Sequence, residues 1–366
     1  MNDLAFSRRG LDRTAQPISA DPRLRGVVDD RAMLRAAADL TRDLNRPDAR
    51  IYWADLIGSA LLGYGALAVA LLEPTQLVAW LAGIVAVLAL YRAGSFIHEI
   101  SHIKHSQLPG FRRAWNLLIG IPLLIPSFLY EGVHNQHHAK TRYGTADDPE
   151  YLPLALMKPW TLPLFLVASA LAPLALLGRF AVLAPLSLLS RRLRGHVVAR
   201  WSGLQINPDF RRRAPEGEAR KLWHRQEAAA SVWAIALIGL GLSGIIPGRE
   251  YVIMFAVTAA TMFLNQVRTL VAHLWENDGE AMSVTAQYLD SVNVPPPATM
   301  PVLWAPVGLR YHALHHLLPG LPYHNLAEAH RRLARTLGED SVYHVTNHRG
   351  LTPLVARLAS STLRRR

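Results

Sequence analysis

Histidines are the residues of this chain that are best placed to do chemistry: it has 16 of them and no cysteine. Without cysteine, disulfides, thiolate zinc sites and iron–sulfur clusters are excluded, so a bound metal must be held by His, Asp or Glu. Imidazole binds zinc, copper, iron and nickel alike, so the histidine pattern predicts metal ligation without choosing the metal. Nine histidines form one HxxxH motif, two HxxHH motifs and one isolated position: His98, His102, His134, His137, His138, His273, His312, His315 and His316.

The spacing within the two HxxHH motifs is that of a helix. Because residues at i, i+3 and i+4 share one helical face, each motif is expected to aim three imidazoles at one point. One first-row ion takes only about four to six ligands, so nine imidazoles imply two metal ions. We expect no metal role for the other seven histidines, which complete no motif: His105, His196, His224, His324, His330, His344 and His348.

The composition predicts that these motifs belong to a membrane protein. Of the 366 residues, 51% are apolar and only 18% are charged, whereas a soluble domain is about a quarter charged. Long apolar stretches approach the roughly 20 residues that cross a bilayer. We therefore expect an all-α integral membrane protein with four transmembrane helices in two hairpins, at residues 51–72, 77–97, 228–246 and 251–267.

Charged residues refine this topology. The net charge of +12 favours anionic headgroups or an acidic partner, and we expect no nucleic-acid binding because nucleic-acid-binding proteins lack such long apolar stretches. Residues 191–225 hold ten Arg or Lys and three acidic residues, which predicts that they lie in the cytoplasm with the N-terminus. By parity of crossings, the histidine motifs then lie in a cytoplasmic helical cap. Asp55 and Arg268, near the ends of two spans, are expected to be interfacial anchors.

Two further apolar stretches, 114–130 and 161–190, are interrupted by prolines and make no net crossing in this topology. The first is expected to dip into the membrane or lie on it, and the second does the same or forms a hairpin. Residues 29–45 carry apolar side chains at helical spacing, which predicts a solvated amphipathic helix. The chain thus divides into a polar N-terminal segment, a membrane and metal-binding part and a basic C-terminal tail, at 1–50, 51–335 and 336–366.

The motifs His98 to His102, His134 to His138 and His312 to His316, with an isolated histidine after the last span, resemble those of the membrane fatty acid desaturase superfamily. The resemblance covers about residues 50 to 335, including the stretch after the third motif. It implies that the nine histidines bind two iron ions and that molecular oxygen is the co-substrate. It also implies two electrons from an external donor and an acyl-type substrate whose chain enters a tunnel between the helices.

Residues near the motifs could support the ligands. Some family members carry an asparagine four residues before the isolated histidine, where this chain has Thr269, and Asn265 or Asn277 could substitute. Metal-bound imidazoles usually need a carboxylate or carbonyl on their second nitrogen. The acidic residues that are close enough in sequence to serve include Glu99, Asp147, Asp148 and Glu276.

The resemblance favours desaturation of a fatty acyl chain, and the short HxxxH motif resembles that of acyl-lipid enzymes. Because the chain has no cysteine and no fused cytochrome motif, its electrons are expected from a separate ferredoxin or cytochrome with its reductase, drawn to the arginine-rich face. The same centre could instead hydroxylate a lipid or hydrocarbon, or oxidise it further as a ketolase or epoxidase. Spacing does not reveal where the second hydrogen lies, so this alternative stays open.

Two alternatives come from other classes of protein. His98-Glu99-Ile100-Ser101-His102 also matches the HExxH pattern of zinc hydrolases, in which the glutamate is the general base. A membrane zinc protease would explain these two histidines and leave seven unexplained. A protein that only binds or stores metal would consume no oxygen.

Overall fold

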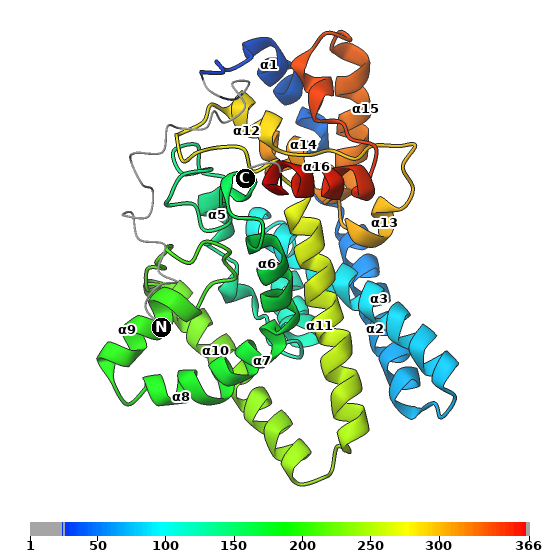
Figure 1. The fold of residues 1–366 in the computed structure, drawn as a ribbon, viewed down its shortest axis with the longest axis vertical. Helices are drawn as coiled ribbons and strands as arrows, with labels where there is room; N and C mark the ends of the chain where they lie inside the picture. The colour runs from blue at the N-terminus through cyan, green and yellow to red at the C-terminus, as the bar shows by residue number, and fades with distance from the viewer. Residues whose placement is uncertain (1–23, 25, 364–366) are drawn as a thin grey trace.

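The computed structural model describes residue 24 and residues 26–363 of the chain. These residues form helices joined by turns and loops, with a few isolated β-bridges and no strand (Figure 1). Three of the described helices are long and apolar enough to cross a membrane: α2 (Ala49–Leu72), α3 (Gln76–His102) and α11 (Gly248–Leu270). The expected all-α membrane architecture is confirmed at this level.

The number of spans differs from the expected four. Helix α10 (Gly217–Leu242) is not among the candidate spans of the described chain. Its first turns carry charged residues, and the helix ends at Leu242 instead of the expected residue 246. The apolar part of α10 is therefore too short to cross a hydrocarbon core of about 30 Å. The span predicted at 228–246 is therefore not confirmed.

A fourth crossing would have to come from the apolar stretch after residue 160. There, α6 (Thr161–Ala170) and the helical segment Ala172–Ser187 are bent by 54° against each other, as in a broken span or a re-entrant loop. The second segment contains α7 (Ala172–Gly178), the π-helical turn η5 (Arg179–Leu183) and α8 (Ala184–Ser187). Proline near the start of α7 and of α8 interrupts the helical hydrogen bonding.

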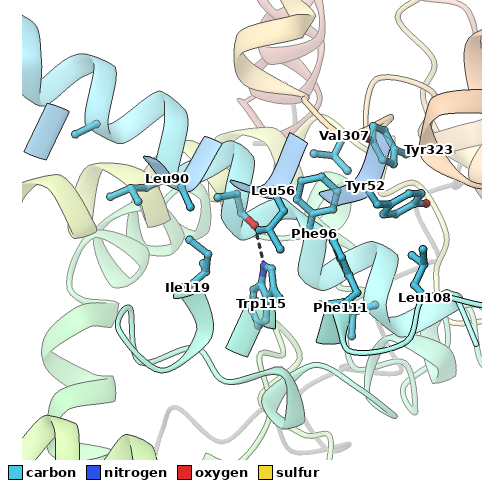
Figure 2. Packing of buried hydrophobic residues seen from close by; sticks show 14 of the residues in the cluster. Tyr52, Leu56, Leu90, Phe96, Leu108, Phe111, Trp115, Ile119, Val307 and Tyr323 are labelled. Carbon is cyan, nitrogen blue, oxygen red and sulfur yellow. Dashed lines mark hydrogen bonds between the residues drawn. The ribbon is translucent and has the colours of Figure 1, made fainter. Parts of the chain in front are cut away.

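Helices α2 and α3 form a close antiparallel hairpin, and its packing positions the first histidine motif. Tyr52 and Leu56 of α2 pack with Leu90 and Phe96 of α3 in one buried cluster. Trp115, in α4 (Phe111–Trp115), completes this cluster and donates a 2.8 Å hydrogen bond from its indole nitrogen to a carbonyl of α3 (Figure 2). The carboxyl end of α3, which carries His98 and His102, is thereby held on two sides.

Gly63→Ala is expected to lower the free energy of unfolding by about 1–3 kcal/mol, because an added methyl would overpack this hairpin. A Cβ at Gly63 would lie 2.7 Å from the Leu90 side chain and 3.2 Å from its backbone nitrogen. Unfolding in detergent micelles, followed by near-UV circular dichroism, measures the change. Gly58→Ala on the same helix is the control: a Cβ there meets nothing within 4 Å, so it should be neutral or stabilise by up to about 1 kcal/mol. Equal behaviour of the two variants would contradict the close approach.

Asp55 has a structural role in the fold. Its carboxylate accepts hydrogen bonds from Arg92 of α3 (Nε, 2.7 Å) and from the Tyr323 hydroxyl (2.8 Å). Tyr323 lies in the 3-10 turn η6 (Tyr323–Asn325) near the third histidine motif. Asp55 therefore ties both helices of the hairpin to the C-terminal part of the chain, and the expectation of simple interfacial anchoring is wrong.

A helical cap stands at the end of the spans where α3 and α11 finish (Figure 1). The amphipathic helix expected at 29–45 is present as α1 (Arg31–Leu40), followed by η1 (Arg42–Leu44). Met33 and Ala37 of α1 are buried against α15 (Leu326–Thr336), so this helix is a packed part of the cap instead of a solvated element. That the cap faces the cytoplasm stays a prediction.

The other helical elements are short, and several carry or flank the histidines. The stretch 114–130 folds as turns around α4, with η2 (Asn116–Gly120) and η3 (Ser127–Leu129), and buries Trp115, Ile119 and Phe128. The remaining elements are α5 (His134–His137), η4 (Leu154–Leu156), α9 (Arg191–Trp201), α12 (Val284–Asp290), α13 (Pro301–Trp304), α14 (His312–Leu317), η7 (Val342–Thr346) and α16 (Leu351–Leu363).

Candidate metal centre

The structure brings all nine motif histidines together at the base of the cap. They come from the end of α3, from α5, from the segment after α11 and from α14. Within each of two groups, the candidate ligand atoms all lie within 4.8 Å of one another. The five-ring group is His98, His102, His134, His138 and His315, and the four-ring group is His137, His273, His312 and His316.

The two HxxHH motifs are divided between these groups, so the expectation that each aims three imidazoles at one point is wrong. Residues i and i+4 of each motif join one group, whereas residue i+3 joins the other. On a helix, i+3 and i+4 point about 100° apart, which separates them when two short helices face each other. His315 of α14 therefore joins His134 of α5 and the adjoining His138, and His137 of α5 joins His312 and His316 of α14.

Distances within the groups fit metal coordination. The Nε2 atom of His315 lies 3.1 Å from Nε2 of both His102 and His138. In the other group, Nε2 of His312 lies 3.0 Å from that of His273 and 3.2 Å from that of His316. Two adjacent ligands about 2.1 Å from an ion, at right angles to each other, stand about 3.0 Å apart. Each group is therefore spaced as one coordination sphere.

Several ring nitrogens are buried without any hydrogen-bond partner. His98 is 6% exposed, and neither of its ring nitrogens has a partner; the Nδ1 atoms of His138, His315 and His316 also lack one. An unpaired buried polar atom costs about 1–3 kcal/mol. Burial also lowers the pKa of His138, His315 and His316 well below the usual value, so these rings are neutral near pH 7. Neutral imidazole is the form that binds metal.

Carboxylates and hydroxyls orient three of the rings through their second nitrogen. His137 Nδ1 lies 2.9 Å from Asp148, and His134 Nδ1 lies 2.9 Å from Glu150. His273 Nδ1 lies 2.8 Å from the Tyr143 hydroxyl, which donates to Asp290 at 2.8 Å. Burial alone would lower the pKa of His137, but the Asp148 carboxylate outweighs it and the pKa is raised. These contacts fix the direction in which each ring points.

Of the expected supporting residues, Asp148 contacts a ring, while the others do not orient one. Glu99 lies 3.6 Å from His98 Nδ1 but accepts from the Tyr52 hydroxyl and the Tyr323 backbone, because neighbours on a helix point about 100° apart. Asp147 is exposed, and Glu276 pairs with Arg357.

The amide and hydroxyl candidates near the isolated histidine do not reach a ring either. Asn277 donates to the carbonyls of Gly144 and Glu280. The side chain of Asn265 is exposed, and the Thr269 hydroxyl donates to the Asn265 carbonyl. These residues are close to His273 in sequence, but the chain turns after α11 ends at Leu270. Their side chains therefore do not point towards its ring.

Glu150 and Tyr143 contact rings and Asp290 accepts from Tyr143, although none of these three residues was expected from the sequence. Only Glu150 had a signal, since it follows Asp148 by two residues on the same loop. Arg268, expected to be an interfacial anchor, is instead 8% exposed, and its Nη2 lies 3.1 Å from His312 Nδ1. The last turn of α11 directs it towards α14, so that expectation is wrong.

Asp148→Asn is expected to weaken metal binding by about 10- to 100-fold, because His137 loses the carboxylate that orients it. Iron retained after dialysis against a graded series of chelator concentrations measures the affinity. Asp147→Asn removes an exposed carboxylate one position earlier and should change nothing. Equal iron retention in the two variants would show that the contact with His137 does not support the site.

The chain matches the family model for fatty acid desaturases across residues 74–347, so it belongs to the fatty acid desaturase family. This family is known for di-iron centres, which fits two histidine groups of this size. The chain is thus an enzyme of the membrane di-iron oxidoreductase superfamily. The zinc-protease alternative is disfavoured, because Glu99 is held by Tyr52 and Tyr323 away from the position of a general base.

One similar protein is described more specifically. A ceramide hydroxylase of Caulobacter vibrioides (strain NA1000 / CB15N) is 51% identical over 326 residues, which cover 89% of this chain and 92% of that protein. This relative supports the hydroxylase alternative better than the expected desaturation.

Proposed function

We propose that this protein hydroxylates a ceramide-type lipid, with two irons held by the nine histidines, molecular oxygen as co-substrate and electrons from a separate donor protein. The observation that carries the proposal is the 51% identity to a ceramide hydroxylase over nearly the whole of both chains. The two compact imidazole groups would hold the two metal ions that such a reaction needs. One oxygen atom of O₂ enters a C–H bond, and the other leaves as water after two electrons and two protons are supplied.

In this proposal, bound iron supplies oxygen activation strong enough to attack an unactivated C–H bond. The chain's own residues do the rest. Asp148 and Glu150 orient His137 and His134 through Nδ1, while the Tyr143 hydroxyl and Asp290 do so for His273. All nine rings are at least partly buried, which keeps water away from reactive species.

Expression in a host that lacks the activity, followed by mass spectrometry of ceramides under ¹⁸O₂, tests the proposal. The expected result is a ceramide that has gained one labelled oxygen atom. Loss of two hydrogens would indicate a desaturase, and a new carbonyl a ketolase. Unchanged ceramides beside another altered lipid would overturn the substrate class. His316→Ala is the inactive control, because it removes a ring of the four-ring group.

A further inference from the structure

A positively charged cavity lies outside the histidine groups, at the start of α10. It measures about 420 Å³ and is open to solvent. Arg112 and Lys221 in its wall are paired with Glu131 (2.8 Å) and Glu218 (2.5 Å). The cationic cavity, as we call it, has as its charged lining residues Arg112, Arg212, Lys221, Arg225, Glu131 and Glu218.

The surroundings of the cationic cavity strengthen its positive charge. Arg225 is exposed and has no carboxylate partner among the described residues. The neighbouring Arg211, Arg213 and Arg220 are exposed as well. Positive surfaces of this kind attract acidic proteins and speed their association, with an effect that falls as salt is added.

The cationic cavity lies at the same end of the fold as the histidines. α10 begins at Gly217 and runs to a short turn, from which α11 returns and ends at Leu270, three residues before His273 (Figure 1). The start of α10 and the end of α11 therefore lie at the same end of this helix pair, so the cavity and His273 are on the same side of its turn.

A short route leads from the wall of the cavity to the five-ring group. Arg212 donates from Nη2 to the carbonyl of Glu131 at 2.7 Å. The preceding residue, Tyr130, stacks on His134 with ring centroids 4.7 Å apart and planes at 17°, and its hydroxyl lies 2.8 Å from His134 Nδ1. Because Glu131 lines the cavity wall, its neighbour in the chain, Tyr130, links the wall directly to a ring of the five-ring group.

We propose that the cationic cavity docks an acidic one-electron carrier, a small iron–sulfur or haem protein, and so delivers electrons beside Tyr130 and His134. The inference rests on the proposed function, because each hydroxylation consumes two electrons that two successive carrier molecules would supply. Complexes of this class are small and transient, so charge complementarity matters more than buried area.

An anionic lipid surface is the competing occupant, and the structure disfavours it. Binding at a lipid surface uses exposed apolar side chains beside the cations. Leu188 and Leu189, next to Arg191, are 79% and 83% exposed and fit that role. Around the cationic cavity, by contrast, two carboxylates line the wall beside the cations. Such mixed charges suit a protein surface better than an anionic lipid surface.

The double variant Lys221→Glu/Arg225→Glu tests the proposal, with an acidic [2Fe–2S] ferredoxin and its NADPH-dependent reductase as electron source and ceramide in uncharged detergent micelles. We expect the KM for ferredoxin to rise about tenfold or more, with kcat at saturating ferredoxin and the KM for ceramide unchanged. Added salt should raise the wild-type KM for ferredoxin more than that of the variant. The control is Arg31→Glu/Arg35→Glu on α1, which reverses two exposed charges at the same helical spacing on another part of the molecule (Figure 1).

Dithionite-reduced methyl viologen replaces the ferredoxin in a second assay, and both variants should then hydroxylate as the wild type does, with unchanged iron content. An unchanged KM for ferredoxin, or an equal change in the control, would overturn the docking site. A defect that appears only in vesicles containing phosphatidylglycerol would assign the cavity to lipid instead. If the wild type hydroxylates no ceramide with either reductant, the proposed function is wrong. The docking site can then still be tested, by comparing ferredoxin binding to the wild type and the variants by calorimetry.

Discussion

His315→Ala is expected to abolish lipid hydroxylation, with turnover falling about 1,000-fold or more, and to reduce bound iron from about two ions per chain to about one. His315 is the ring that α14 contributes to the five-ring group, where its Nε2 lies 3.1 Å from those of His102 and His138. Alanine removes a ligand atom and opens space for water in a buried site. Product analysis by mass spectrometry and metal analysis of the purified protein measure the two losses.

His105→Ala is the matched control for this prediction. His105 lies three residues after His102 but is exposed and belongs to neither group. It should therefore retain the activity and iron content of the wild type. Full activity and unchanged iron in His315→Ala would remove this ring from the centre, whereas loss of both ions would show that the two groups bind metal as one unit.

Glu227→Ala is expected to lower the free energy of unfolding by about 3–5 kcal/mol, because it leaves a buried guanidinium without its counter-charge. Glu227 of α10 accepts from Arg179 of η5 at 2.5 Å and from Arg194 of α9 at 2.7 Å. The side chain of Arg179 is only 2% exposed and also donates to Ser202 at 2.9 Å. This ion network joins the bent apolar segment to α9 and α10, and unfolding in detergent measures its loss.

Two comparison variants distinguish the stability effect of a buried charge from that of an exposed ion pair. Glu218→Ala breaks the exposed pair with Lys221, whose side chains are 86% and 66% exposed, and should change stability by less than about 1 kcal/mol. Arg179→Met/Glu227→Leu removes both buried charges and should recover much of the stability lost in Glu227→Ala. A Glu227→Ala variant as stable as Glu218→Ala would contradict a buried network.

The residue types and their spacing were enough to identify the nine clustered histidines, the absence of cysteine ligands and the apolar helices α2, α3 and α11. These features are local, because helical spacing fixes the direction of a side chain relative to its neighbours. The span predicted at 228–246 was too long, because the residue at which α10 ends depends on the turn that follows Leu242. The histidine motifs also favoured desaturation, but enzymes that desaturate and enzymes that hydroxylate share these motifs. The motifs therefore do not distinguish the two reactions.

Which ring joins which group was decided only by the tertiary structure. His137 and His315 exchange partners because α5 and α14 face each other, although 177 residues separate His315 from His138. The same holds for Arg268 beside His312 and for Tyr143 between His273 and Asp290. Such contacts join segments that are far apart in sequence, and their directions follow from how whole helices pack, a quantity that no local spacing contains.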